Sequence, residues 1–170
     1  MNKKVALFGS AFNPPSLGHK SVIESLLHFD QVWLVPSIAH AWGKSMLDYS
    51  KRCQLVDAFI SDLGHEKILR STIEESLYQP GESVTTFAVL DALSVQHPDI
   101  DFTFVLGPDN LFNFAKFYRA EDIVKRWSVL ACPEKIAVRS TDIRHAVANG
   151  QSIMHLTTPS VTQMLKNIQF

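Results

Sequence analysis

The chain has 170 residues, of which 46% are hydrophobic, and both values are typical of one globular domain of roughly 100–200 residues. Lys and Arg number 16 against 17 Asp and Glu, so the formal charge of −1 lacks the basic excess of a nucleic-acid-binding domain. No apolar run reaches the roughly 18 residues of a membrane span, and the apolar stretch after Lys4 is too short for a signal peptide. We therefore expect a single cytoplasmic domain, residues 1–170, with neither nucleic acid nor a membrane as its partner.

Short apolar runs alternate with amphipathic stretches, which is typical of a parallel sheet whose strands are joined by helices. Strands are predicted, in chain order, at residues 5–8, 32–35, 68–69, 102–106 and 129–132. The apolar faces of the predicted helices lie at residues 22–27, 55–63, 84–93, 143–147 and 161–168. These elements predict an α/β fold, a Rossmann-like doubly wound parallel sheet of about five strands with flanking helices and a C-terminal helical segment. Ligands of such sheets bind beyond the carboxyl ends of the strands, where the strand order reverses.

Several helix ends are marked in the sequence. Ser50 is a candidate N-cap of the second helix, and Gly64 is a stop signal at its end. The third helix is expected to end before Pro98, because the residue that precedes a proline disfavours helical geometry. Pro159 is a favoured first residue for the last helix.

The first predicted strand runs into residues 9–19, GSAFNPPSLGH. Two prolines cannot lie inside a helix, so the next helix is expected to begin at Ser16 or Leu17. Its free N–H groups and positive dipole end would face the crevice as an anion site, and Gly18 would let a phosphate or a neighbouring backbone come close. His19 shares the inward face of this helix and could donate a hydrogen bond to a phosphoryl oxygen. The alternative is that Ser16 only caps the helix and His19 only bonds to the backbone.

A second helix start lies at residues 138–144, VRSTDIR. Ser140 suits an N-cap, and Asp142 suits the positive end of the helix dipole. Arg144, four residues after Ser140, could place its planar guanidinium on a polyphosphate. The alternative is a capped surface helix with an exposed arginine.

Both segments resemble signatures of the nucleotidylyltransferase superfamily. The first resembles G-G-T-F-D-P-x-H-x-G-H, whose paired histidines contact nucleotide phosphates. Gly9, Phe12, Pro14, Gly18 and His19 match it, Ser10, Ala11 and Asn13 depart from it, and Ser16 replaces the first histidine, where some relatives have threonine. The second resembles I-S-S-T-x-I-R, which binds the triphosphate of ATP, with Arg139 in place of the first serine.

The resemblance extends over nearly the whole chain and narrows to the bacterial nicotinate-nucleotide adenylyltransferases. Residues 83–90 are similar to that family's S-Y-T-x-x-T-L helix start, whose threonine, here Thr85, helps to hold the nicotinate end. Residues 106–111 resemble its G-x-D-x-L turn, which would place Asp109 near the nucleotides. Phe117 and Tyr118 resemble its W-Y/H-R motif, whose tryptophan stacks on the pyridine ring. Alternatively, Phe117 belongs to the core, since most large aromatic residues are buried.

Two segments depart from this family. After the second strand the family usually carries P-P-H-K, whereas residues 36–44 here read PSIAHAWGK, with His40 and Lys44 as displaced counterparts. Trp42 in the same loop would be a lid aromatic or a contact with another chain. The family also has a long segment before its second signature, which residues 133–138 shorten to six. This shortening could alter adenine binding, substrate choice or oligomer contacts.

The resemblance implies that the chain transfers an adenylyl group from ATP to nicotinate mononucleotide, giving the dinucleotide precursor of NAD and pyrophosphate. His19 and Arg144 are the expected catalytic residues. The implied ATP site comprises Gly9, Ser10, Phe12, Ser16, Gly18, His19, Asp109, Ser140, Thr141 and Arg144. The implied nicotinate-nucleotide site comprises Ser10, Asn13, Lys44, Thr85, Phe117 and Tyr118. Mg²⁺ is expected mainly on the phosphates of ATP, and Cys53 and Cys132 lack the spacing of metal ligands.

Two other functions remain open at this level. The acceptor could be another phosphorylated compound, such as pantetheine phosphate or nicotinamide mononucleotide, and the reaction could be cytidylyl transfer. The chain could also be a degenerate relative that binds nucleotides as a sensor, which Ser16, Asn13 and the short segment favour. His19, Ser140 and Arg144 argue against a sensor. The resemblance also leaves room for a homo-oligomer.

Overall fold

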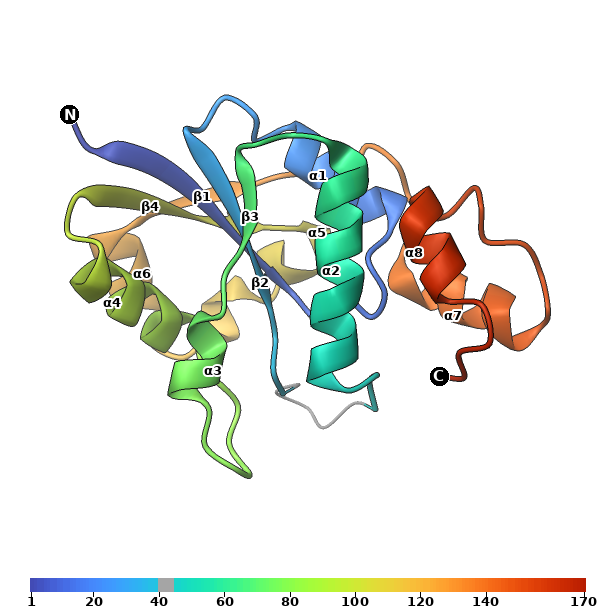
Figure 1. The fold of residues 1–170 in the computed structure, drawn as a ribbon. Helices are drawn as coiled ribbons and strands as arrows, with labels where there is room; N and C mark the ends of the chain where they lie inside the picture. The colour runs from blue at the N-terminus through green and yellow to red at the C-terminus, as the bar shows by residue number, and fades with distance from the viewer. Residues whose placement is uncertain (40–44) are drawn as a thin grey trace.

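The computed structural model describes residues 1–39 and 45–170, so the predicted contributions of His40, Trp42 and Lys44 lie outside the described residues. Five parallel strands form one sheet in the order β3-β2-β1-β4-β5 (Figure 1). They are β1 (Lys3–Ser10), β2 (Gln31–Pro36), β3 (Ile68–Arg70), β4 (Ile100–Leu106) and β5 (Ser128–Ala131). The chain builds outward from β1 to β3 and then returns to place β4 on the other side of β1. The predicted doubly wound sheet is confirmed, and the strand order reverses between β1 and β4.

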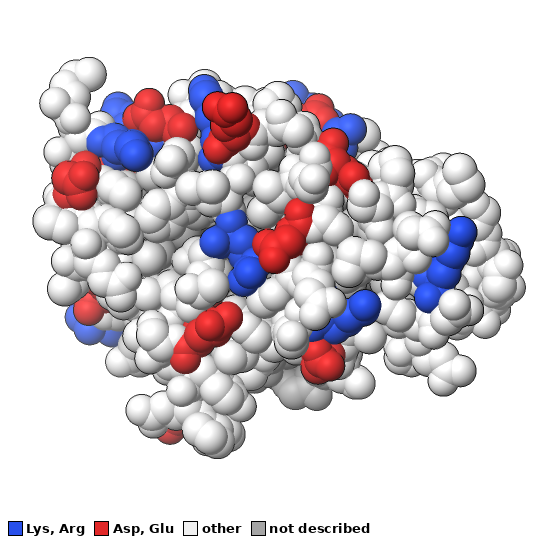
Figure 2. Space-filling view, viewed as in Figure 1, with Lys and Arg blue, Asp and Glu red and all other residues white. Residues whose placement is uncertain are grey.

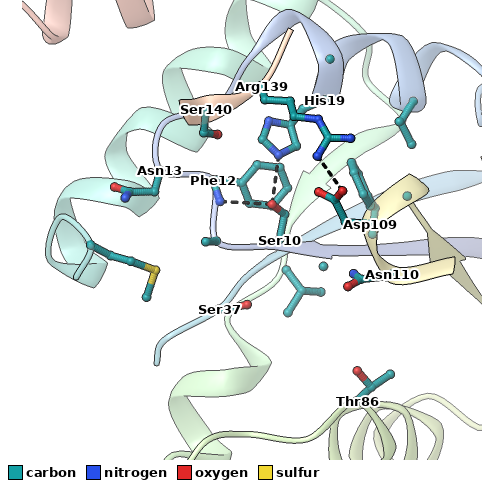
Figure 3. Close-up of a pocket in the computed structure, with 18 of the residues that line it drawn as sticks. Ser10, Phe12, Asn13, His19, Ser37, Thr86, Asp109, Asn110, Arg139 and Ser140 are labelled. Atoms are coloured by element: carbon teal, nitrogen blue, oxygen red, sulfur yellow. Dashed lines mark hydrogen bonds and ion pairs between the residues drawn. The ribbon is translucent and has the colours of Figure 1, made fainter. Parts of the chain in front are cut away.

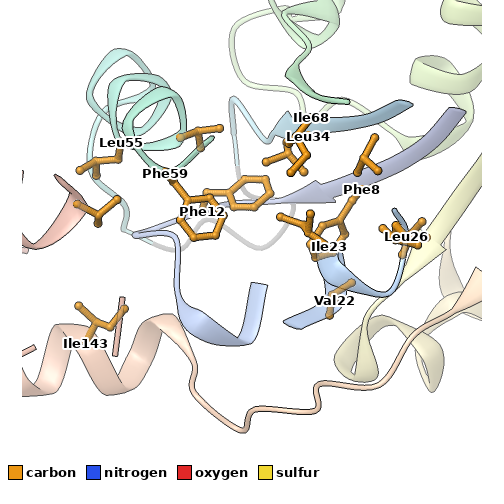
Figure 4. Packing of buried hydrophobic residues seen from close by; sticks show 14 of the residues in the cluster. Phe8, Phe12, Val22, Ile23, Leu26, Leu34, Leu55, Phe59, Ile68 and Ile143 are labelled. Atoms are coloured by element: carbon orange, nitrogen blue, oxygen red, sulfur yellow. The ribbon is translucent and has the colours of Figure 1, made fainter. Parts of the chain in front are cut away.

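Each face of the sheet is covered by its own apolar cluster. Ala6 and Phe8 on β1 belong to one cluster, whereas Val5 and Leu7 belong to the other, because successive side chains of a strand point to opposite faces. Figure 4 shows the first cluster, in which Phe59 and Ile23 pack near Phe8 between the sheet and its helices. A parallel sheet buried in this way explains why its strands read as continuous apolar runs.

The helices divide between the two faces. The first cluster includes side chains from α1 (Leu17–Glu24), α2 (Tyr49–Leu63), α7 (Ser140–Ala148) and α8 (Pro159–Met164). The second includes side chains from α3 (Ile73–Leu77), α4 (Thr86–Gln96) and α6 (Ala120–Arg126). Two short elements, α5 (Pro108–Leu111) and η1 (Phe114–Lys116), follow the end of β4. The sequence did not predict α3, α5, η1 or α6, because elements of three to seven residues are too short for a helical period to show.

The helix boundaries confirm some sequence signals and correct others. Gly64 ends α2 in the left-handed conformation at φ +68°, and Pro159 is the first residue of α8, as expected. Ser50 is not the N-cap of α2. The cap is Asp48, whose carboxylate accepts the Lys51 N–H at 2.7 Å. A carboxylate also suits the positive end of the helix dipole better than a hydroxyl does.

The surface carries both signs of charge. On the face seen in Figure 2, lysines and arginines lie among aspartates and glutamates. Ion pairs among the described residues include Arg70–Asp57 and Arg126–Asp91. Within the described residues, no helix has both the length and the apolar character needed to cross a membrane.

Candidate active site

A pocket of about 870 Å³ lies beyond the carboxyl ends of β1, β2 and β4, a volume within the range of small-molecule sites. This is the place where a doubly wound sheet binds its ligands. Every predicted site residue that the structure describes lines it, namely Gly9, Ser10, Phe12, Asn13, Ser16, Gly18, His19, Thr85, Asp109, Phe117, Tyr118, Ser140, Thr141 and Arg144. Segments more than 120 residues apart in the chain therefore meet at one cavity.

His19 lies at the start of α1 with its two ring nitrogens in different roles. The Ser16 N–H donates to Nδ1 at 3.0 Å, so the proton of the neutral ring is on Nε2, which faces the Ser10 hydroxyl at 3.0 Å (Figure 3). The Phe12 ring packs against the imidazole with 4.7 Å between centroids. Burial lowers the pKa of His19 from 6.5 to about 4. At neutral pH the residue is therefore an uncharged donor directed into the pocket.

The start of α1 corrects two expectations. Ser16 is the N-cap, as one alternative held, but its hydroxyl is buried and donates to the Val138 carbonyl at 3.0 Å. The free N–H groups expected at this helix start are partly used by the chain itself, since Leu17 donates to the Leu156 carbonyl and His19 to the Ser16 hydroxyl. The C-terminal segment that folds over α1 supplies this partner, which the local sequence could not reveal.

Gly18 accommodates a neighbouring backbone. A side-chain Cβ at this position would overlap the carbonyl oxygen of Val138 and lie 3.2 Å from its carbonyl carbon. The sequence left open whether Gly18 makes room for a phosphate or for a neighbouring backbone. In the structure it makes room for the backbone of Val138. The short segment 133–138 packs directly on α1 and leads into α7.

The second motif is tied to the first by hydrogen bonds. Ser140 is the first residue of α7 rather than its N-cap, which is Arg139. Its hydroxyl donates to the Pro14 carbonyl at 2.6 Å, and Arg144 Nη1 donates to the Asn13 carbonyl at 2.8 Å. The serine is thereby used to fasten α7 to the loop after β1. Ile143 beside it is fully buried, so the arginine is held at the pocket by packing as well.

An acidic pair borders the same end of the pocket. Asp109, in the first turn of α5, accepts a hydrogen bond from Arg139 Nη1 at 2.6 Å (Figure 3). Glu134 lies 3.6 Å from Arg139 Nε. Arg139 was not among the predicted site residues, although its replacement of a serine in the second signature was the signal that could have identified it.

Aromatic side chains line the opposite end of the pocket. The Phe117 ring packs against Phe114 and Phe104 at 5.3 and 6.2 Å, so it joins the core and also borders the cavity. Tyr118 is 62% exposed. Thr85 caps α4 by accepting the Ala88 N–H at 3.1 Å while lining the cavity. Both roles considered for Phe117 are thus compatible with the structure, and Thr85 combines helix capping with a place at the pocket.

Phe12 and Asn13 are buried residues of the loop after β1 that also border the pocket. Phe12 is fully buried and its ring packs against His19, so its predicted contact with ATP stays a prediction. Asn13 is 5% exposed, and its side-chain oxygen accepts the Leu47 N–H at 3.1 Å. These residues position the loop after β1.

A buried arginine that no sequence motif indicated holds the loops beyond β1 and β2. Arg52 on α2 is 1% exposed. It donates to four carbonyl oxygens at 2.6–3.3 Å, those of Ala11, Ser37, Ile38 and Leu47. The nearby Glu74 accepts the Ile38 N–H at 3.2 Å, and burial raises the pKa of this carboxyl to about 7.

The fold and these motifs agree with known proteins. Residues 7–146 match the cytidylyltransferase-like family. A probable nicotinate-nucleotide adenylyltransferase of Myxococcus xanthus is 32% identical over 165 residues, covering 88% of this chain and 84% of the relative. A crystal structure from Vibrio parahaemolyticus, of a protein assigned to the nicotinate-nucleotide adenylyltransferases, is 57% identical with a TM-score of 0.87, covering 97% of this chain and 93% of that one.

A more distant structure shares the fold. The Plasmodium falciparum nicotinic acid mononucleotide adenylyltransferase, complexed with NaAD, has a TM-score of 0.76 at 15% identity, covering 96% of this chain and 95% of that one. Three observations lead to one assignment: the order of the strands, the hydrogen bonds that join the starts of α1 and α7, and the extent of these matches. The chain belongs to the cytidylyltransferase-like family and, within it, to the nicotinate-nucleotide adenylyltransferases.

Proposed function

We propose that residues 1–170 act as one domain that transfers the adenylyl group of ATP to nicotinate mononucleotide and releases pyrophosphate. The observation that carries this proposal is the convergence of His19 and Arg144 on one pocket, with the two helix starts bonded through Ser140 and Pro14. A phosphate oxygen of the mononucleotide attacks the α-phosphorus of ATP, and the bond to the β-phosphate bridging oxygen breaks. The electron pair of that bond leaves with pyrophosphate.

His19 and Arg144 stabilise the charge that develops on the phosphoryl oxygens. The neutral His19 ring donates from Nε2, and the proton stays on that nitrogen because Nδ1 is occupied by the Ser16 N–H. The Ser10 hydroxyl lies 3.0 Å from Nε2, at a position that a phosphoryl oxygen would take as acceptor. The guanidinium of Arg144 adds a fixed positive charge. Catalysis would come from positioning and electrostatic stabilisation, without a covalent enzyme intermediate.

Magnesium would arrive with ATP. The carboxylates at the phosphate end, Asp109 and Glu134, both neighbour Arg139, and the described residues contain no cluster of three His, Cys, Asp or Glu side chains suited to a metal. Oxygen ligands from the phosphates suit Mg²⁺, which usually keeps few protein ligands. When bound, the ion would neutralise charge on the leaving pyrophosphate.

The acceptor would lie toward Thr85, Phe117 and Tyr118. An exposed tyrosine and a partly buried phenylalanine offer apolar faces on which a pyridine ring could stack. The Thr85 hydroxyl accepts the Ala88 N–H and keeps its own proton available for donation to a carboxylate such as that of nicotinate.

Pyrophosphate release tests the proposal. Purified protein is incubated with MgATP and, separately, nicotinate mononucleotide, nicotinamide mononucleotide or pantetheine phosphate. We expect release above background with nicotinate mononucleotide, and the His19→Ala variant should reduce it. Release with another acceptor alone would reassign the substrate. Saturable ATP binding without release on any acceptor would establish a nucleotide-binding sensor.

A further inference from the structure

The phosphate end of the pocket contains a cation that the motifs do not account for. Arg139 stands immediately before α7, and its side chain is 49% exposed. Its guanidinium contacts Asp109 at 2.6 Å and Glu134 at 3.6 Å, and all three residues line the pocket. In Figure 3 the Arg139–Asp109 pair borders the cavity that His19 and Ser140 also line.

The neighbouring polar groups of the two motifs are largely committed to the chain. The Ser16 hydroxyl donates to the Val138 carbonyl and is buried. The Ser140 hydroxyl donates to the Pro14 carbonyl. Arg144 uses Nη1 for the Asn13 carbonyl and Nη2 for the Thr141 hydroxyl. A polyphosphate entering this end of the pocket therefore meets Arg139 as a cation whose partners are the carboxylates of Asp109, which is 70% exposed, and of Glu134, whose side chain is 17% exposed.

From this arrangement we infer that Arg139, which pairs with Asp109 in this structure, is a further phosphate-binding residue that contacts the β- or γ-phosphate of ATP. The inference rests on the proposed function, because it assumes that ATP is a substrate.

The exchange of Asp109 for a phosphate is favourable on physical grounds. Asp109 is 70% exposed, and an ion pair to so exposed a carboxylate contributes little to stability, because water solvates and screens the charge. A guanidinium binds phosphate through a planar pair of N–H donors, which is stronger and geometrically specific. After the exchange, the exposed Asp109 carboxylate is hydrated again. Asp142 already accepts the backbone N–H of Arg139 at 2.8 Å, so the main chain stays fixed while the side chain moves.

Calorimetric titration with AMP, ADP and ATP, each with Mg²⁺ and without an acceptor, tests the inference. We expect Arg139→Ser to weaken ATP binding by about tenfold, as for loss of one charge-assisted hydrogen bond, and to change AMP binding by less than about twofold. Arg139→Lys keeps the positive charge but lacks the planar pair of N–H donors, so it should bind ATP more tightly than Arg139→Ser and more weakly than the unmodified protein.

The control is Arg126→Ser. Arg126 is 46% exposed and pairs with Asp91 away from the pocket, so its loss should leave all three affinities unchanged. If the serine disturbs the start of α7, Arg139→Gln removes the charge at similar length and carries the same expectation. Equal weakening of AMP and ATP, or no weakening of ATP, would overturn the inference while leaving the proposed function intact. Failure of the unmodified protein to bind any of the three would instead overturn the proposed function.

Discussion

Gly18 is the position at which a single added methyl group should disturb both the fold and the site. In Gly18→Ala the new Cβ would overlap the Val138 carbonyl oxygen and would lie 3.4 Å from the Ile136 carbonyl oxygen. Both obstacles are backbone atoms, so no side-chain rotation relieves them. Segment 133–138 must move away from α1, and Arg139 and Ser140 follow it directly in the chain.

The size of the effect follows from two contributions. Overpacking of this kind costs about 1–3 kcal/mol. The displacement also breaks the hydrogen bond from the Ser16 hydroxyl to Val138, which contributes about 1 kcal/mol. We expect the free energy of unfolding to fall by about 2–4 kcal/mol, which for a chain of this length corresponds to a decrease in Tm of roughly 6–12 °C.

Urea and thermal unfolding measure this change, and steady-state kinetics should show a raised KM for ATP. Gly107→Ala is the matched control for stability, because a Cβ there has no heavy atom within 4 Å and the backbone φ is −75°. The control should unfold within about 1 kcal/mol of the unmodified protein. If the two variants proved equally stable, the close packing of segment 133–138 on α1 would be refuted.

Three further predictions concern buried polar groups. His19→Ala should lower kcat by about 100-fold with a smaller rise in KM, because the lost donor acts on charge that develops in the transition state. The exposed His65→Ala is the control, and an unchanged kcat for His19→Ala would contradict this role. The pKa of His19 is lowered to about 4, so the unfolded ring takes up a proton below pH 6.5 while the folded ring stays neutral. Stability is therefore lost as pH falls from 6.5 to 4, by on the order of 3 kcal/mol, and urea titrations of His19→Gln should lack that part of the decline. Parallel pH curves for the two proteins would rule out a buried neutral ring. Arg52→Met should lower the free energy of unfolding by about 3–5 kcal/mol, because it leaves buried carbonyls unpaired and Glu74 without its neighbouring charge. Arg70→Met, at an ion pair whose aspartate is exposed, should cost less than about 1 kcal/mol, and similar losses in both variants would show that Arg52 does not hold the loops.

Much of the fold could be predicted because its information is local. Apolar runs located all five strands: β1, β2 and β4 lie inside the sheet and are largely buried, whereas β3 and β5 form its edges and are shorter and more exposed. The two prolines before Ser16 determined where α1 begins, and Gly64 determined where α2 ends. The short elements α3 and α6 were missed because five and seven residues span fewer than two helical turns, too few for an apolar repeat to be recognised in the sequence.

The candidate site was predicted as a set of residues, while their individual tasks were decided by long-range contacts. Ser140 was expected to cap its helix, but it bonds to Pro14, 126 residues away in the sequence. Ser16 lines the pocket and its expected contact with a phosphate stays a prediction, while its hydroxyl bonds to Val138, 122 residues away. Lys44 lies outside the described residues, so its predicted contact with the nicotinate nucleotide stays a prediction.

The sequence by itself determined the order of the five strands and of the helices α1, α2, α4, α7 and α8 along the chain, together with the two segments that carry phosphate-binding residue types. Those features depend on neighbours a few positions apart, through side-chain alternation, helical spacing and the fixed φ of proline. Only the tertiary structure decided which polar groups remain available to a substrate, because each hydroxyl or guanidinium bonds to whichever partner the fold brings within about 3 Å. It left the Nε2 donor of His19 and the guanidinium of Arg139 at the pocket, and it used the hydroxyls of Ser16 and Ser140 to join the two helix starts.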